Sequence, residues 1–215
     1  MLGIVLLFAA LFAQREPHVK PPQILLIVRE PIRPGALDAY SKIEEEIAKG
    51  SASLGCPHPY LALQPLDGAS EVWWLNGFVS QAEVTQVGDT YSQKTAFSAM
   101  LKPNQDRKAQ LAGTPVEVYA NYRRDLSRQS WSLGQGRFLV ITVTSGDSPA
   151  QGSVYEAADG RRFVVRSART RAEAESIARA AGQGTTVLAV KPGWSFPAKE
   201  WVASDPEFWR GAVEK

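Results

Sequence analysis

Residues 72–83 read VWWLNGFVSQAE, and residues 162–173 repeat their outline as RFVVRSARTRAE, an offset of 90 residues (from position 72 to position 162). In each stretch an apolar, β-type run precedes a hydroxyl residue, Ser80 or Thr170, that has a glutamate three positions later. This is the spacing of a capping box, in which the hydroxyl accepts from an early helical N–H and the glutamate reaches back to the N–H of the cap residue. Each stretch therefore predicts a strand that leads into a helix. Their recurrence predicts two related α+β units, with a cavity or an interface between their sheets.

The first half predicts the order β-α-β-β-α-β, which is the ferredoxin-like arrangement. The expected elements are a strand at 23–30, an amphipathic helix at about 36–53, strands at 60–64 and 71–78, one or two helices from Ser80 to about residue 101, and a strand at 116–123. On the first helix, Glu44, Glu45 and Glu46 are expected to form a solvated face.

The second half predicts a reduced copy, β-β-β-α-β, with strands near 138–144, 153–157, 162–168 and 185–191 and a helix from Thr170 to Ala181. Residues 145–152 are too few and too rich in helix breakers to supply the first helix. The tail is rich in aromatic residues: Trp194, Phe196, Trp201, Phe208 and Trp209. We expect these rings to cover the sheet face that the missing helix leaves bare, since exposed apolar surface costs about 25 cal/mol per Å². A tail that binds a partner is the alternative.

The N-terminus predicts export. Residues 1–13 carry no charged side chain and form an apolar run within the ~7–15 residues of a signal peptide, short of the ~20 that span a membrane. We expect a cleaved signal at 1–13, an extended lead-in at 14–22, a ferredoxin-like domain at 23–126 and a reduced repeat with an aromatic tail at 137–215. The mature protein would be secreted or periplasmic with no stable membrane span; an uncleaved anchor is the alternative.

Composition excludes several classes of function. The net charge of +2 is small and dispersed, which argues against nucleic-acid binding. Cys56 is the single cysteine, so an intrachain disulfide is excluded. With only His18 and His58 beside it, no tetrahedral metal site with nitrogen and sulfur ligands can be assembled, which leaves a carboxylate-rich site as the alternative, and no glycine-rich phosphate loop precedes a helix. We therefore expect no metal and no cofactor.

A family resemblance rests on residues 27–40, IVREPIRPGALDAY, on the 71–78 strand and on the helix that Ser80 begins. These stretches resemble the dimeric α/β-barrel superfamily, which includes antibiotic-biosynthesis monooxygenase-like and NIPSNAP-like proteins. In that superfamily a strand passes through a Pro-Gly turn, here Pro34-Gly35, into the first helix, and two ferredoxin-like units place their sheets face to face. The resemblance implies that this chain forms such a pseudo-dimeric barrel within itself and is a monomer.

Candidate site residues come from the strand faces. Trp74 and Asn76 share one face of the 71–78 strand, and Tyr119 and Asn121 share the polar face of the last strand of the first half, which we expect to look into the barrel. Relatives in the superfamily use Asn and Trp in the barrel cavity, so the resemblance implies Trp74 and Asn76 as catalytic candidates. The expected ligand-binding residues are His58, Tyr60, Trp74, Asn76, Tyr119, Asn121 and Arg166. The alternatives are a core role for Trp74 and backbone bonding for Asn76.

Arg166 occupies the position of Asn76 in the second copy and shares a strand face with Arg162. The two could hold an anionic ligand, or they could form surface ion pairs.

Two functions remain open. The first is an exported ligand-binding or interaction protein that takes a small apolar or aromatic molecule. The second is a cofactor-independent, monooxygenase-like enzyme acting on an aromatic or polyketide-like small molecule. A cavity of about 300–1,000 Å³ with Asn76 facing inward would favour the enzyme, and a filled sheet interface would favour binding or structure alone.

Overall fold

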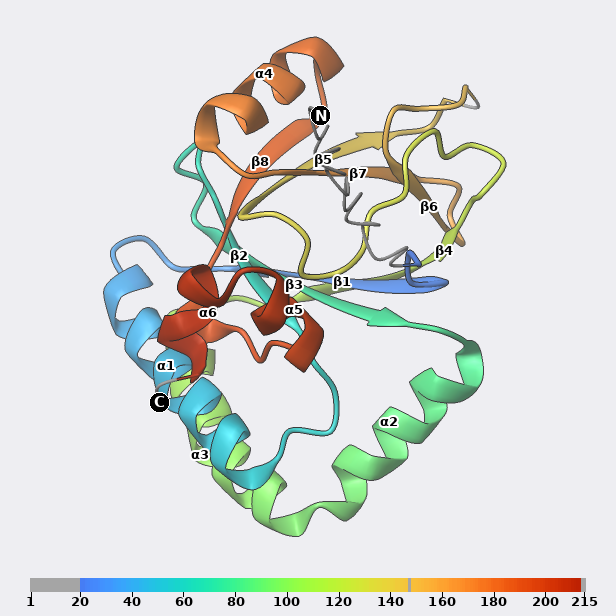
Figure 1. Cartoon of the computed structure of the whole chain (residues 1–215). Coiled ribbons are helices and arrows are strands. Elements are labelled where there is room, and N and C mark those ends of the chain that lie inside the picture. Colours follow the sequence, from blue (N-terminus) through green and yellow to red (C-terminus); the bar gives the residue numbers. More distant parts are fainter. Residues whose placement is uncertain (1–19, 147, 214–215) are drawn as a thin grey trace, which may run out of the picture.

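Eight antiparallel strands close into one barrel in the computed structural model, which describes residues 20–146 and 148–213 (Figure 1). The expected signal at 1–13 lies outside the described residues. The elements are, in chain order, β1 (Ile24–Pro31), α1 (Leu37–Leu54), β2 (Leu61–Pro65), β3 (Glu71–Phe78), α2 (Gln81–Gln93), α3 (Thr95–Leu111), β4 (Val116–Tyr122), β5 (Phe138–Thr144), β6 (Ser153–Ala157), β7 (Arg162–Ala168), α4 (Arg171–Ala181), β8 (Thr185–Val190), the 3₁₀ turn η1 (Pro192–Trp194), α5 (Lys199–Ser204) and α6 (Pro206–Val213).

The two halves of the barrel have the same strand order and the same register. Around the barrel the order is β4-β1-β3-β2 in the first half and β8-β5-β7-β6 in the second. Ile27 pairs with Leu75 in the first half, and Ile141 pairs with Val165 at the matching point of the second. Two seams, β2 with β8 and β4 with β6, join the halves. In this correspondence β2 matches β6 and β8 matches β4, so the two seams are equivalent.

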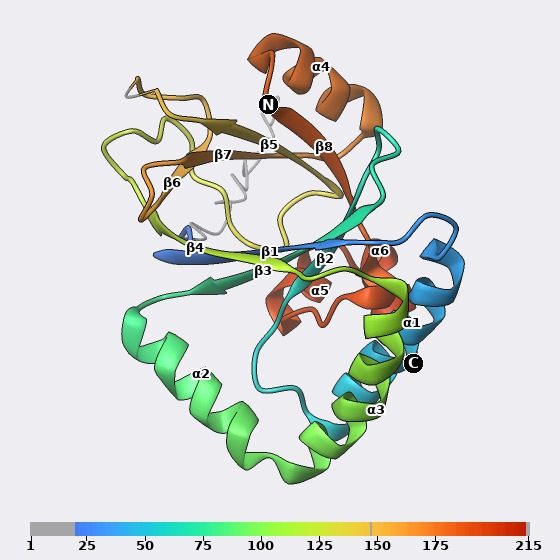
Figure 2. The ribbon, with the colours of Figure 1, turned by 180° about the vertical axis from the view of Figure 1, so that it is seen from behind.

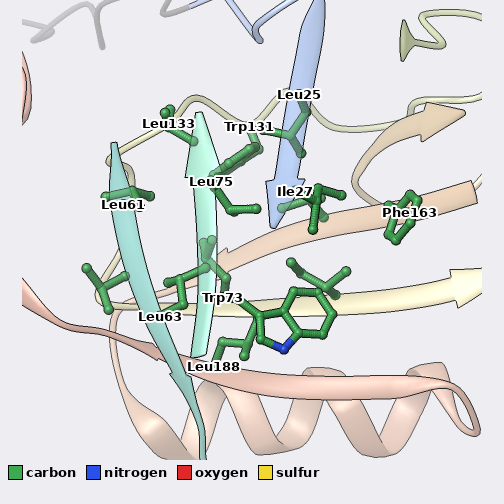
Figure 3. Close-up of a cluster of buried hydrophobic side chains, with 14 of the residues drawn as sticks. Leu25, Ile27, Leu61, Leu63, Trp73, Leu75, Trp131, Leu133, Phe163 and Leu188 are labelled. Atoms are coloured by element: carbon green, nitrogen blue, oxygen red, sulfur yellow. The ribbon is translucent and has the colours of Figure 1, made fainter. Parts of the chain in front are cut away.

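Apolar side chains fill the barrel interior (Figure 3). Alternation along β3 sends Trp73 and Leu75 inward, where they join Ile27 of β1, Leu63 of β2 and Leu188 of β8 in one cluster. Trp131 and Leu133, in the segment that links the halves, belong to the same cluster. The barrel therefore has a packed core of the kind that a small barrel needs, with side chains in place of a cavity.

The expected orientation of the polar strand face is wrong. On β4, Ala120 is fully buried and Val118 and Tyr122 pack against the barrel core, whereas Val116 is 56% exposed. Tyr119 and Asn121 therefore point out of the barrel, as Trp74 and Asn76 do on β3. The physical reason is that the barrel is narrow enough to be filled, so β4 turns its apolar face, with Val118, Ala120 and Tyr122, inward.

Both capping boxes form, with one difference from the expected pattern. Glu83 N donates to Ser80 Oγ at 3.2 Å, and Glu173 N donates to Thr170 Oγ1 at 3.2 Å. Each glutamate, however, accepts from the residue before the cap: Val79 N at 2.6 Å and Arg169 N at 2.8 Å. The boxes fix the angle at which α2 and α4 leave their strands.

Helix α3 extends further than the sequence predicts. It continues through Pro103 to Leu111, ten residues past the expected end near residue 101. Proline removes one helical hydrogen bond, yet α3 continues past it and packs against α1. The two helices approach closely where Met100 lies over Gly50. A Cβ at position 50 would come within 2.8 Å of Met100 Sδ, so only glycine fits there without a shift of Met100.

The aromatic tail does not cover the face left by the missing helix, which corrects the expectation. Leu126 and Ala150 cover that face by packing on Val154 and Val164 of β6 and β7. The tail lies near α1 and β2 instead (Figures 1 and 2), and Asp205 there binds Arg137 through an ion pair of 2.9 Å. Its rings divide between two apolar clusters, Trp194 packing with Tyr40 and Val72, and Trp201 and Trp209 joining the cluster of the barrel interior.

Candidate functional site

A cavity of about 930 Å³ lies on the outer face of the first sheet, between β1, β3 and β4 on one side and α1, α2 and α3 on the other. Figure 2 shows α2 running away from the end of β3 and α3 running back toward the sheet beside α1. The lining is mixed: apolar and aromatic side chains over most of the wall, with charged side chains at one end. The large open space is thus outside the barrel and not within it.

The floor of the cavity consists of two rows of side chains across the sheet. Register places Asn76, Leu26 and Tyr119 in one row, and the second row holds Trp74, Val28 and Glu117. Because successive residues on a strand point to opposite faces, the register that fills the barrel with Trp73 and Leu75 also presents these rows to the helices.

Aromatic rings form much of the wall. Tyr60 meets Trp74 edge to face at a centroid distance of 5.8 Å, and Tyr91 lies 5.4 Å from Phe97. The Tyr91 hydroxyl is 3.1 Å from the sulfur of Cys56. Burial raises the pKa of the Tyr60 and Tyr91 hydroxyls well above the usual range of a phenol, so both remain neutral at physiological pH.

The charged end contains one ammonium between two carboxylates. Lys108 Nζ lies 3.0 Å from Glu30 Oε2 and 2.6 Å from Glu44 Oε1, and the Tyr40 hydroxyl donates to Glu30 Oε2. The same ammonium lies 5.0 Å from the ring centre of Tyr40 and 5.2 Å from that of Trp74. We call Glu30, Tyr40, Glu44 and Lys108 the acidic cluster.

Burial governs the protonation of the acidic cluster. It raises the pKa of Glu44, and Lys108 opposes this shift by stabilising the ionised carboxylate. Burial lowers the pKa of Lys108, but the attraction of Glu44 and Glu30 outweighs burial, so the net pKa of the lysine is raised and it stays charged. Burial, Glu44 and Glu30 all raise the pKa of Tyr40, which remains a neutral donor.

Glu44 contradicts the expected solvated face of α1. Its side chain is 2% exposed, whereas Glu45 and Glu46 are exposed as expected. An α-helix turns about 100° per residue, so three consecutive glutamates cannot all face the same way. Glu44 lies on the same side of α1 as the buried Tyr40 and Ile47, which brings its carboxylate to Lys108.

Four of the residues predicted from the sequence line the cavity: Tyr60, Trp74, Asn76 and Tyr119. The Asn76 amide makes one long hydrogen bond, 3.5 Å from Nδ2 to the carbonyl of Pro59, so most of its bonding capacity is unused within the described residues. Trp73 is buried in the barrel, and the core role considered for Trp74 holds in part, because Trp74 packs, partly buried, against the cluster that contains Tyr40 and Val72.

Three predicted residues lie elsewhere. His58 is buried behind the cavity wall, stacked on Phe78 with its Nε2 3.0 Å from the carbonyl of Gly77, and burial lowers its pKa. Asn121 is exposed beside the β4–β6 seam. Arg166 lies in the second half, in the lining of a separate cavity of about 350 Å³. Its neighbour on that face, Arg162, pairs with Glu156 at 2.5 Å.

Sequence reasoning missed Glu30 and Lys108. One signal for Glu30 was available. It shares a strand face with Ile24, Leu26 and Val28, which are all apolar, so a carboxylate on that face is unusual. Lys108 lies beyond the point where the helix was expected to end, so nothing connected it to the site.

Within residues 20–146 and 148–213, no three His, Cys, Asp or Glu side chains gather closely enough to hold a metal ion. Over the same residues, no helix has the length and apolar character to cross a membrane.

Comparison with known proteins finds similarity in fold alone. No protein-family model matches the sequence, and no curated protein matches it. Two of the loosely similar crystal structures are each of a "putative monooxygenase". The protein from Lactobacillus acidophilus NCFM has a TM-score of 0.47 and 9% identity over 79% of this chain and 93% of its own. The protein from Fusobacterium nucleatum subsp. nucleatum ATCC 25586 has a TM-score of 0.47 and 10% identity over 84% of this chain and 94% of its own. Similarity this loose carries no argument about function.

Proposed function

We propose that this protein binds a small, largely apolar molecule in the cavity between its first sheet and α1, α2 and α3. The observation that carries the proposal is the cavity itself, whose volume of about 930 Å³ falls within the ~300–1,000 Å³ of ligand pockets. Its lining also has the composition of such pockets, with aromatic and aliphatic walls and a few polar groups at one end.

Filling the cavity is expected to abolish binding. Val87 on α2 lines the cavity and is half-buried, so a Val87→Trp side chain would occupy space that the ligand needs. We expect the affinity for the neutral apolar probe N-phenyl-1-naphthylamine to fall by at least about tenfold, as measured by fluorescence titration.

Thr85→Trp is the matched control, because Thr85 is exposed on the same helix and does not line the cavity. This variant should bind the probe like the wild-type protein. Wild-type affinity in Val87→Trp would contradict the proposed location. Mass spectrometry of the purified protein under native conditions would identify a natural ligand that remains bound.

A second candidate is catalysis of the cofactor-independent, monooxygenase-like kind. It is favoured by one observation, the presence of both Trp74 and Asn76 on the cavity floor with an amide that is almost free to bind a substrate oxygen. A developing oxyanion would gain most from such an amide in the transition state.

If the protein is an enzyme, Asn76→Ala should lower turnover of the co-purifying molecule by about 10²–10³. The melting temperature should change little, because the bond to Pro59 is long and a typical hydrogen bond contributes only about 1 kcal/mol. Oxygen consumption and thermal melts give the two readouts. Asn121→Ala, on the same side of the sheet but outside the cavity lining, is the control. Equal turnover in both variants would exclude this role for Asn76.

We also propose that the barrel consists of two ferredoxin-like units in tandem, at 23–126 and 137–215, the second without its first helix. The identical register of the two halves supports this arrangement. The two seams between the units supply the closure that single-unit proteins of this kind obtain from a second subunit, so we propose that the protein is a monomer. We also propose that it is exported and that residues 1–13 are removed.

A further inference from the structure

We propose that the ligand is an organic cation, an amine with an aromatic or aliphatic body, whose ammonium group binds at the acidic cluster. This inference rests on the proposed function, since it assigns a ligand class to the same cavity.

The charge balance of the acidic cluster is the first argument. Lys108 is the one cation paired with Glu30 and Glu44 among the described residues, so two largely buried carboxylates share a single ammonium. The lysine itself is only 15% exposed, which limits how far solvent screens the remaining charge. A bound cation would balance the remaining negative charge of the two carboxylates, whereas a bound anion would add to that charge.

The Glu44 carboxylate is the second argument. Its side chain is 2% exposed and lines the cavity, and Lys108 Nζ lies 2.6 Å from its Oε1. The contact is a close ion pair whose direction is poor for a hydrogen bond, so Oε1 can still accept from a well-directed donor. A buried carboxylate oxygen gains stability from each well-directed donor that it accepts. A ligand N–H group would supply the missing donor.

The aromatic wall is the third argument. Trp74 and Tyr60 both line the cavity and meet edge to face at a ring-centroid distance of 5.8 Å. The Lys108 ammonium already lies 5.2 Å from the Trp74 ring centre, within the range of cation–π attraction. The wall thus favours a positive charge next to an apolar body. Arg33 and Glu117 also line the cavity, but both are exposed and of opposite sign, so screening limits their influence on the choice of ligand.

Three ligands that differ in one group test the proposal on the wild-type protein. Isothermal titration calorimetry with 4-phenylbutylamine, 4-phenylbutan-1-ol and 4-phenylbutyrate compares a cation, a neutral donor and an anion on the same body. We expect the amine to bind about tenfold tighter than the alcohol, since a hydrogen bond to a charged group contributes more than a neutral one. The carboxylate should bind more weakly than the alcohol.

Two outcomes separate this inference from the proposed function. Binding of all three ligands with equal affinity, or tighter binding of the carboxylate, would overturn the preference for a cation and leave the binding cavity intact. Failure of all three to bind, with no binding of N-phenyl-1-naphthylamine either, would overturn the proposed function and this inference together.

A pair of variants assigns the effect to the acidic cluster. Glu44→Gln should reduce affinity for the amine by about tenfold and leave affinity for the alcohol within about threefold, since only the cation loses a charged partner. Glu45→Gln makes the same change at an exposed position of α1 and should alter neither affinity. An unchanged preference for the amine in Glu44→Gln would overturn the proposed binding position.

Discussion

Replacing Lys108 with methionine is expected to lower the free energy of unfolding by about 3–5 kcal/mol. Methionine keeps the unbranched shape of the lysine stem, so the main loss is the charge. Glu30 and Glu44 would remain buried side by side without a cation, and breaking a buried ion pair by removing one partner leaves an uncompensated charge. Urea unfolding at neutral pH measures the effect.

Lys102→Met is the matched control on the same helix. Lys102 is 77% exposed and pairs with Asp106, so its loss should cost at most about 1 kcal/mol. The deficit of Lys108→Met should also depend on pH. Burial raises the folded-state pKa of Glu44, and without Lys108 nothing opposes that shift. A carboxyl group with a raised folded-state pKa stabilises the folded protein at low pH, and this stabilisation is lost as the pH rises through that pKa. The loss of unfolding free energy in Lys108→Met should therefore be smaller at acidic pH than at neutral pH. A deficit equal to that of Lys102→Met would contradict the buried arrangement.

Gly134→Ala is expected to lower the free energy of unfolding by about 2–5 kcal/mol. Gly134 has φ +84°, a conformation that costs a residue with a side chain roughly 1–2 kcal/mol. In addition, a Cβ there would lie 2.2 Å from Cγ of Trp201, so the indole would have to leave its place in the apolar cluster. Overpacking of this kind adds typically about 1–3 kcal/mol.

Gly160→Ala separates the two contributions. Gly160 has nearly the same backbone angle, φ +82°, but a Cβ would meet no atom within 4 Å. This variant should therefore lose only the roughly 1–2 kcal/mol of the backbone term. Thermal or urea unfolding of both variants gives the difference, which is the cost of displacing Trp201 from its place beside Gly134. Equal losses would mean that Trp201 moves away at no cost.

The strands and caps could be predicted because their signals are local. The hydroxyl-to-glutamate spacing at Ser80 and Thr170 and the apolar runs before it predict strand-to-helix units that the structure contains. The choice between the two faces of β3 could not be predicted, because Trp73 and Trp74 are equally apolar. Which of them faces the barrel depends on how β4 and the second half pack, and neighbouring residues carry no information about that.

The site was predictable in part for a similar reason. Tyr60, Trp74, Asn76 and Tyr119 were found because each is a conspicuous residue on a strand or beside one. The acidic cluster was not found, because it depends on three distant elements: β1, α1 and α3. A run of glutamates argues locally against burial, and a proline argues locally against a continuing helix. Tertiary packing overrides both.

The closure of the barrel determines when this chain can complete its fold during synthesis. Strand β8 pairs with β2 on one side and with β5 on the other, and it is the last strand in the sequence. Until residues 185–190 have left the ribosome, β2 and β5 present open edges, and open edges invite pairing with other chains. A nascent chain of this protein therefore passes through an aggregation-prone stage that ends only when its final strand is available.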